Sequence, residues 1–419
     1  MRKTQILPFA LMVLVPRAAM PQGDPLGPEF RVNAYTTGGQ GLASVAADSA
    51  GDFVVVWTGG ASQDGSSYGI FAQRYAVSGA PQGPEFRVNT YTTGVQYRGV
   101  VAAEPSGSFV VVWESATQDG SARGLFGQRY DATGVPQGPE FPVNTYTTND
   151  QYGPTVLANP SGGFLVLWHS NGQDGSGFGV FGQRYGGSGA PLGPEFRVNT
   201  FTTGNQFYPS VGATSSGSFV VSWSSIGQDG AGYGIYGQRY DASGAPVGPE
   251  FRVNTYTTGS QSVSAAASDS SGDFVIVWAS DSQDGLGYGI FGQRFAGSGA
   301  PLGTEFRVNS YTTNTQFIPA ISADSTGNFV VAWQSNGEDG ASDGIFGQRF
   351  DGSGAPFGPE FRVNSYTTSQ QVAPIVAAAA SGEFVVVWNS NGQDGQGSGV
   401  FGQRYSPIVP VELMHFRVE

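Results

Sequence analysis

The chain has 419 residues, a formal net charge of -13, two histidines and no cysteine. A chain without cysteine has no disulfides, no thiolate nucleophile and no cysteine-bound zinc. Its single lysine is Lys3, so the rest of the chain holds neither a Schiff-base lysine nor a P-loop lysine. The negative charge repels nucleic acid and anionic membrane surfaces, and we expect no nucleic-acid partner.

The N-terminal residues 1–20 are predicted to be a secretory signal peptide. Arg2 and Lys3 precede an apolar run over residues 6–15, which is too short to span a bilayer as a helix. No other apolar run approaches that length, so we expect no membrane insertion. The remaining residues, 21–419, are expected to form one domain that is secreted, bound at the cell surface or periplasmic.

Tryptophan recurs along the whole chain at a nearly constant interval. The first interval is 56 residues and the other five are 55, which is a regularity that tandem structural repeats produce. Each copy is too short to bury a core alone, so all seven copies must share one structure. The tryptophans are Trp57, Trp113, Trp168, Trp223, Trp278, Trp333 and Trp388.

Each repeat contains four segments that read as strands, joined by short turns rich in glycine and proline. In chain order they are a run of small residues such as 44–48, an apolar run such as 53–57 (FVVVW), a GIFGQRY run, and an edge segment such as 86–89 (FRVN). The apolar run fits a strand covered on both faces, the small residues fit a crowded axis, and the edge segment alternates apolar with polar residues. Short connections favour an antiparallel meander.

Seven such units predict an all-β fold, a seven-bladed β-propeller of four-stranded antiparallel blades. The strand order resembles that of WD-type propellers, although the Gly-His and Trp-Asp signatures of that family are missing. A β-solenoid has much shorter rungs, and a string of small sandwich domains needs longer units. The edge segment occurs eight times, counting residues 30–33 and 416–419. Either end can complete the last blade, and we favour the N-terminal segment because it ties the two termini together.

The QDG loop between the second and third strands supplies one aspartate per repeat. An Asp before Gly caps backbone N–H groups in a turn, and this interpretation is favoured over calcium binding because one carboxylate per loop is few for a strong site. Residues 62–66 (SQDGS) resemble the Asp-box hairpin of sialidase-like propellers, which implies a fold element. No cofactor is expected, with calcium as the open alternative. The candidate calcium ligands are Asp64, Asp119, Asp174, Asp229, Asp284, Asp339 and Asp394.

Two further residue types recur in every repeat. The glutamines that precede the small-residue strand, such as Gln96, are expected to satisfy backbone groups at the mouth of the channel. Arginines of the third strand, such as Arg74, and glutamates before the edge strand, such as Glu85, are predicted to form a ladder of ion pairs. Identical use in all blades indicates structure and not catalysis.

An asymmetric site must lie where the repeat is broken, and the most variable position follows the tryptophan. This position is expected to open the loop on the face that carries the QDG loops and the YTT linkers. Its variability is more simply explained by sequence drift at exposed positions. Five charged or titratable departures fall on two adjacent repeats, and they are the candidate ligand-binding residues: Arg98, Glu114, Arg123, Asp150 and His169. The variable residues are Thr58, Glu114, His169, Ser224, Ala279, Gln334 and Asn389.

Near-identical blades favour a non-enzymatic binding or scaffold protein that recognises carbohydrate or protein on that face. The repeat W-x-S-x-x-QDG, as in residues 388–395, resembles that of secreted bacterial proteins. One alternative is a glycoside-active enzyme that pairs Glu114 with Asp150 or Asp119, because glycosidases use two carboxyl groups across the scissile bond. The other alternative is a calcium-stabilised structural repeat.

Overall fold

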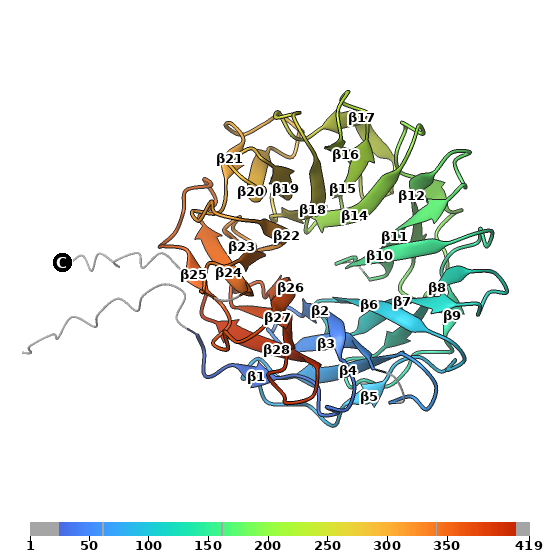
Figure 1. The fold of residues 1–419 in the computed structure, drawn as a ribbon. Helices are drawn as coiled ribbons and strands as arrows, with labels where there is room; N and C mark the ends of the chain where they lie inside the picture. Colours follow the sequence, from blue (N-terminus) through green and yellow to red (C-terminus); the bar gives the residue numbers. More distant parts are fainter. Residues whose placement is uncertain (1–24, 61–62, 161, 341, 408–419) are drawn as a thin grey trace, which may run out of the picture.

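A computed structural model describes residues 25–60, 63–160, 162–340 and 342–407. These residues form seven four-stranded antiparallel sheets, which are arranged as blades around a central opening (Figure 1). The described residues contain no helix, and thus no helix that could cross a membrane. The fold is the all-β seven-bladed β-propeller that the repeat predicts. The predicted signal peptide, 1–20, lies outside the described residues. We number the blades 1 to 7 in chain order, starting from the blade that begins at Gly41.

The innermost strand of each blade lines the central opening, as its small residues predict. Inner strands of neighbouring blades lie beside one another, and there is little room between them. A Cβ atom on Gly212 would lie only 2.8 Å from Ser268 Oγ and 3.0 Å from a backbone atom of Ala267. The inner strands are β2 (Gly41–Ala47), β6 (Gln96–Ala103), β10 (Gln151–Ala158), β14 (Gln206–Ala213), β18 (Gln261–Ser268), β22 (Gln316–Ala323) and β26 (Gln371–Ala378).

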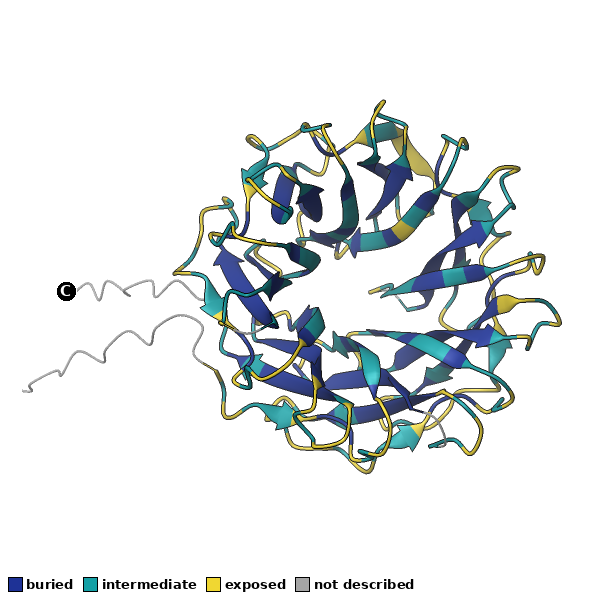
Figure 2. Cartoon of the chain, viewed as in Figure 1, coloured by how far each residue is buried: buried dark blue, intermediate teal, exposed yellow. Residues whose placement is uncertain are grey.

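The second strand of each blade forms the core because its two faces pack against two different blades. In blade 1, Val55 and Trp57 pack toward blade 7, whereas Val54 and Val56 pack toward blade 2. All seven tryptophans are fully buried, and the second strands are buried along most of their length (Figure 2). These strands are β3 (Phe53–Gly59), β7 (Phe109–Ala116), β11 (Phe164–Asn171), β15 (Phe219–Ile226), β19 (Phe274–Asp281), β23 (Phe329–Asn336) and β27 (Phe384–Asn391).

The third and fourth strands complete each blade toward the rim. The third strands are β4 (Gly69–Tyr75), β8 (Arg123–Tyr130), β12 (Phe178–Tyr185), β16 (Tyr233–Tyr240), β20 (Tyr288–Phe295), β24 (Asp343–Phe350) and β28 (Ser398–Tyr405). The fourth strands form the outer edges, with partly exposed residues, as predicted. They are β1 (Phe30–Arg31), β5 (Phe86–Arg87), β9 (Phe141–Pro142), β13 (Phe196–Arg197), β17 (Pro246–Arg252), β21 (Phe306–Arg307) and β25 (Phe361–Arg362).

The N-terminal edge strand closes the ring. Strand β1 pairs with β28, so blade 7 consists of β26, β27 and β28 from the C-terminal end of the described chain and β1 from its N-terminal end. The Val32 N–H donates to Val400 O at 2.8 Å, and the Val400 N–H donates to Asn33 Oδ1 at 2.7 Å. The expectation that the N-terminal segment completes the last blade is confirmed. The competing segment, 416–419, lies outside the described residues.

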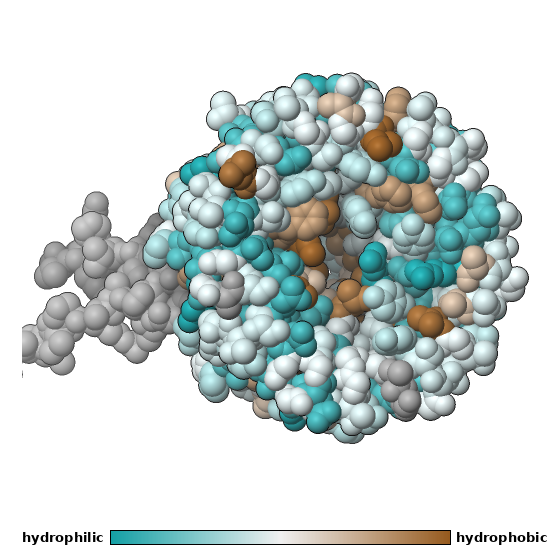
Figure 3. Space-filling view, viewed as in Figure 1, coloured by the Kyte–Doolittle hydropathy of each residue, from teal (hydrophilic) through white to brown (hydrophobic). Residues whose placement is uncertain are grey.

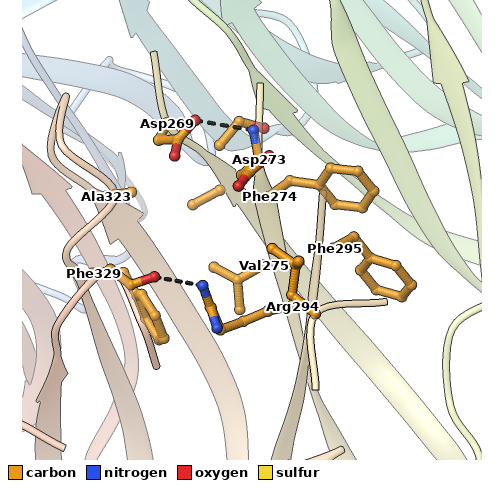
Figure 4. Close-up of a pocket in the computed structure, with 13 residues that line it drawn as sticks. Asp269, Asp273, Phe274, Val275, Arg294, Phe295, Ala323 and Phe329 are labelled. Carbon is orange, nitrogen blue, oxygen red and sulfur yellow. Dashed lines mark hydrogen bonds between the residues drawn. The ribbon is translucent and has the colours of Figure 1, made fainter. Parts of the chain in front are cut away.

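The repeated arginines and glutamates link neighbouring blades, but not as the predicted ladder of ion pairs. Six of the seven third-strand arginines donate to backbone carbonyl oxygens in the turn of the following blade, as Arg294 does to Gly352 and Ser353 at 2.5 Å. Figure 4 shows Arg294 among the residues that line the cavity beside it. The cavity beside Arg294 has a volume of about 30 Å³, which has room for little more than water. The prediction of Arg–Glu pairing was wrong because these arginines donate to backbone carbonyl oxygens of the following blade, while the glutamates accept from linker and loop groups.

The glutamates before the edge strands join the blades on the opposite side of the sheet. The Glu140 Oε2 atom accepts hydrogen bonds from the Thr90 N–H at 2.8 Å and from the Thr90 hydroxyl at 2.9 Å. Its Oε1 atom accepts one from Gln118 Nε2 of the QDG loop at 2.5 Å. Each carboxylate therefore ties its own QDG loop to the linker that follows the preceding edge strand.

Candidate functional site

The QDG aspartates act mainly as turn residues. The Asp64 Oδ1 atom accepts a hydrogen bond from the Ser66 N–H at 2.9 Å, and four other copies, Asp119, Asp174, Asp229 and Asp394, make the same contact. Within the part of the chain that the structure describes, no three His, Cys, Asp or Glu side chains are grouped so that they could hold a metal ion. The loops therefore do not fit a carboxylate-rich calcium site, which needs six to eight oxygen ligands.

The repeated glutamines lie at the channel mouth and satisfy backbone groups there, as predicted. Gln96 is fully buried, and its Nε2 atom donates to Thr93 O at 3.0 Å. Its Oε1 atom accepts from Asn89 Nδ2 at 3.3 Å, which fixes the amide orientation. These contacts recur in the other blades, so the glutamines belong to the fold.

The variable residue after the tryptophan is buried between blades in six of the seven blades and partly buried at Gln334, which corrects the expectation that it opens an exposed loop. The second strand continues past the tryptophan, so the next residue faces the neighbouring blade. There it contacts the first residues of the next blade's inner strand. A β-bulge at that point leaves one backbone N–H without a partner in the sheet. Thr58 Oγ1 accepts the N–H of Arg98 at 3.0 Å, and Ser224 Oγ accepts that of Val263 at 3.1 Å.

The bulge places one residue of each inner strand in the left-handed backbone region. The φ angles are 50° at Arg98, 53° at Tyr208, 54° at Val263 and 53° at Ala373, and Gly153 has a φ of 64°. Such a conformation is strained for residues other than glycine. Since it occurs in every blade, the strain belongs to the fold, but it places the side chain of this residue at the mouth of the channel.

Glu114 is the charged member of the variable set, and two arginines surround it. Its Oε2 atom lies 3.3 Å from Arg123 Nη1 and its Oε1 atom lies 3.7 Å from Arg98 Nε. The Gly153 N–H donates to Oε1 at 2.9 Å. Burial raises the pKa of the Glu114 carboxyl, while Arg98, the Gly153 N–H and Arg123 oppose this shift. Glu114 is only 2% exposed, so it holds the arginines in place instead of facing a substrate.

His169 occupies the same position one blade further on, and aromatic rings enclose it. The ring centres of Tyr152, Phe207 and Tyr208 lie 4.3, 5.2 and 5.9 Å from its imidazole. Neither ring nitrogen has a hydrogen-bond partner among the described residues. Burial, followed by the charge of Arg98, lowers the pKa of His169 to about 3, so the imidazole is neutral at physiological pH. A neutral imidazole here packs as another flat ring.

Asp150 completes the predicted group, and the five residues gather at the boundary between blades 2 and 3. Asp150 forms a backbone bridge with Arg123, and its carbonyl oxygen accepts the Asn171 N–H at 2.9 Å. The structure thus brings Arg98, Glu114 and Arg123 into direct contact and places Asp150 and His169 beside them. Glu114 is too enclosed to serve as one of two carboxyl groups facing each other across a glycosidic bond.

Three tyrosine rings near this group are partly or largely exposed, and sequence reasoning missed them. Tyr208 is 46% exposed at the bulge of β14, next to His169. Tyr97 and Tyr152 are the second residues of β6 and β10 and are partly exposed. We define the channel-mouth patch as Tyr97, Arg98, Arg123, Tyr152 and Tyr208. Hydrophobic and hydrophilic side chains lie close together around the central opening (Figure 3). The missed signal was the aromatic residue that directly follows the repeated glutamine in only some blades, as Tyr97 and Tyr152 do, together with Tyr208 one position further on in blade 4.

A second departure that was missed lies in blade 6, where the QDG loop reads EDG. In the other blades the loop glutamine donates to the carboxylate before the edge strand, as Gln228 does to Glu250 at 2.6 Å. Here Glu338 contacts Glu360, so two carboxyl groups share one hydrogen bond. Burial, with added contributions from Glu360, raises the pKa of Glu338 to about 8. A carboxyl that stays protonated can donate as the glutamine does, which explains how the pair is tolerated.

The ring of seven antiparallel blades closed by an N-terminal strand defines the chain as a β-propeller. The sequence matches no protein-family model and no curated protein. Solved structures do match. A protein of unknown function from Dyadobacter fermentans aligns with a TM-score of 0.54 at 10% identity, covering 93% of this chain and 100% of that one.

Two structures of carbohydrate-active proteins align about as well. The α-L-arabinanase of Penicillium chrysogenum, complexed with arabinobiose, has a TM-score of 0.50 at 12% identity. The alignment covers 90% of this chain and 98% of the arabinanase chain. The endosialidase of phage phi92 has a TM-score of 0.50 at 8% identity, over 94% of this chain and 71% of its own. These structural alignments establish the shared propeller fold, but identities this low do not establish a shared site.

Proposed function

We propose that this protein binds glycan chains at the channel-mouth patch and does not cleave them. The observation that carries the proposal is the combination of exposed tyrosine rings with two arginines that a buried glutamate holds in place. Aromatic faces pack against the apolar faces of sugar rings, and fixed guanidinium groups donate several hydrogen bonds to sugar hydroxyls. Arg98 and Arg123 are 38% and 50% exposed, so both have donors to offer.

Binding is favoured over hydrolysis because of Glu114. Its carboxylate already accepts the Gly153 N–H and lies beside two guanidinium groups, so it has no room to act on a glycosidic oxygen. The known carbohydrate-active propellers of similar fold make a saccharide a reasonable ligand class, and they keep hydrolysis as the alternative to be tested. We further propose that residues 1–20 direct secretion, which would bring the protein to extracellular glycans.

Binding to an array of immobilised glycans tests the proposal, with Tyr208→Ala as the main variant. Ala373 has the same backbone conformation in blade 7, so alanine is compatible with the fold at this position. We expect Tyr208→Ala to weaken binding about tenfold, in the range for one lost stacking contact. Leu286→Ala, which alters an 82% exposed side chain in a distant loop, is the control and should bind as the wild type does.

Two results would overturn the proposal. One is equal binding by the wild type and Tyr208→Ala, which would remove the patch from recognition. The other is the release of new reducing ends when the bound glycan is incubated with the protein, which would establish hydrolysis. Melting temperatures measured alongside separate a lost contact from a lost fold.

A further inference from the structure

A separate cleft lies between blades 4 and 5, on the side of the edge strands. Its volume is about 840 Å³, within the range of about 300 to 1,000 Å³ that is usual for small-molecule sites. We call it the blade 4–5 cleft and define it by Gln228, Asp229, Tyr236, Arg252, Thr304 and Glu305. None of these residues belongs to the channel-mouth patch.

Two departures from the repeat face this one cleft. Tyr236 stands in β16 where the other six blades have phenylalanine, and Thr304 precedes β21 where the other six have proline. Each substitution adds a hydroxyl group, and threonine also restores a backbone N–H that proline lacks. The replaced residues of the other blades are Phe71, Phe126, Phe181, Phe291, Phe346 and Phe401, and Pro28, Pro84, Pro139, Pro194, Pro249 and Pro359.

Amide and carboxylate groups of the QDG loops form part of the cleft wall. Gln228 Nε2 donates to Glu250 at 2.6 Å, and Gln283 Nε2 donates to Glu305 at 2.5 Å, so both amide oxygens point away from these carboxylates. Those two oxygens and Asp229 Oδ2 are buried and have no hydrogen-bond partner among the described residues, but the equivalent atoms of other blades are in the same state, so they belong to the repeat and not to this cleft. The hydroxyl groups of Tyr236 and Thr304 are therefore the polar groups that distinguish this cleft from the other blades.

The lining also distinguishes among classes of occupant. Two carboxylates, Asp229 and Glu305, outnumber the one guanidinium, Arg252, which disfavours an anion. A metal ion needs a compact group of ligands, whereas this cleft is large and the described residues contain no such group. The rings of Tyr236 and Phe295, together with Pro301, add an apolar surface. Burial and the Asp229 carboxylate raise the pKa of Tyr236, so its hydroxyl remains a neutral donor.

We propose that the blade 4–5 cleft binds one or two rings of a neutral saccharide, with the hydroxyls of Tyr236 and Thr304 as specific contacts. Hydroxyl groups, no net charge and an apolar face suit this lining together, and a sugar has all three. The site is independent of the channel-mouth patch. Two sites on one propeller would hold a long glycan more tightly than either site alone.

Variants that restore the repeat residues test the proposed cleft site. Tyr236→Phe and Thr304→Pro install the residues that the other six blades already carry, so both should fold. The probes are four free disaccharides, maltose, cellobiose, lactose and arabinobiose, and binding is followed by saturation-transfer NMR and calorimetry. We expect at least one disaccharide to bind the wild type, and the double variant to bind it about tenfold or more weakly.

Two control variants keep this test separate from that of the channel-mouth patch. Pro359→Thr introduces the same hydroxyl in blade 6 and should leave disaccharide binding unchanged. Tyr208→Ala should leave it unchanged as well, whereas it should weaken binding to the glycan array. The cleft proposal is wrong if no disaccharide binds the wild type, if the double variant binds as well as the wild type, or if Tyr208→Ala removes the signal.

Discussion

Replacing Glu338 with glutamine restores the repeat residue in blade 6, where two carboxyl groups meet. In the wild type, Glu338 must keep its proton to donate to Glu360. Glu360 in turn accepts the N–H of Ser310 at 2.6 Å and its hydroxyl at 2.9 Å, which links blades 5 and 6. Ionised Glu338 would repel Glu360 and weaken this link, whereas a glutamine at the same position would donate at every pH.

The sign of the pH dependence follows from the direction of the shift. Burial and Glu360 raise the pKa of Glu338 from 4.5 to about 8, so the fold favours the protonated form. The stability that this proton provides is complete below pH 4.5, decreases as the pH rises, and is lost once the pH passes about 8. Because Glu338 is only partly buried, water screens the repulsion, and we expect a loss of about 1 to 2 kcal/mol in the free energy of unfolding.

Urea unfolding of the wild type and Glu338→Gln at pH 4.5, 7 and 9 measures this difference. The two proteins should be equally stable at pH 4.5, and the variant should be more stable by about 1 to 2 kcal/mol at pH 9. The reciprocal change, Gln393→Glu, places the same carboxyl pair in blade 7 and should create the same pH dependence there. A stability difference that is identical at all three pH values would refute the reasoning.

Three further predictions concern the core, the buried histidine and the loops. Trp223→Ala should cost about 3 to 5 kcal/mol because the side chain is fully buried between blades, and a loss below about 1 kcal/mol in urea melts would contradict that placement. The His169 ring should show no titration between pH 5 and 8 in long-range ¹H–¹⁵N NMR spectra, since burial lowers its pKa to about 3; a midpoint near 6.5 would place the ring in water. EDTA should leave the melting temperature unchanged if the QDG aspartates act as turn residues, and a clear drop would establish a bound cation.

The fold was predictable because a constant interval between tryptophans depends only on the repeat and not on any single contact. The composition of each strand then indicated its radial position, since small residues suit the axis and fully apolar runs suit a sheet covered on both faces. The closure by β1 was also predictable, although the sequence offered a second segment for the same place.

The contacts between blades were not predictable in the same way. Whether Glu114 is exposed depends on where the second strand ends, and that strand runs three residues past Trp113, to Ala116. The partner of Arg129 is Ser188, which is 59 residues further on in the next blade, and nothing local in the sequence points to it. Glu338 was predictable in principle, since it breaks the same repeat that exposed the other departures.

Comparing the departures shows how a repeat protein separates structure from recognition. Glu114 differs from its counterparts, yet two arginines and a backbone N–H surround it, so its neighbours have adjusted to keep the blade intact. Tyr236 and Thr304 also differ, but they face a cleft that nothing in the described chain fills. A departure that its neighbours compensate is explained by packing. A hydroxyl added toward an open cleft has only a ligand or water left to meet, which is why the blade 4–5 cleft is the stronger place to look for a free saccharide.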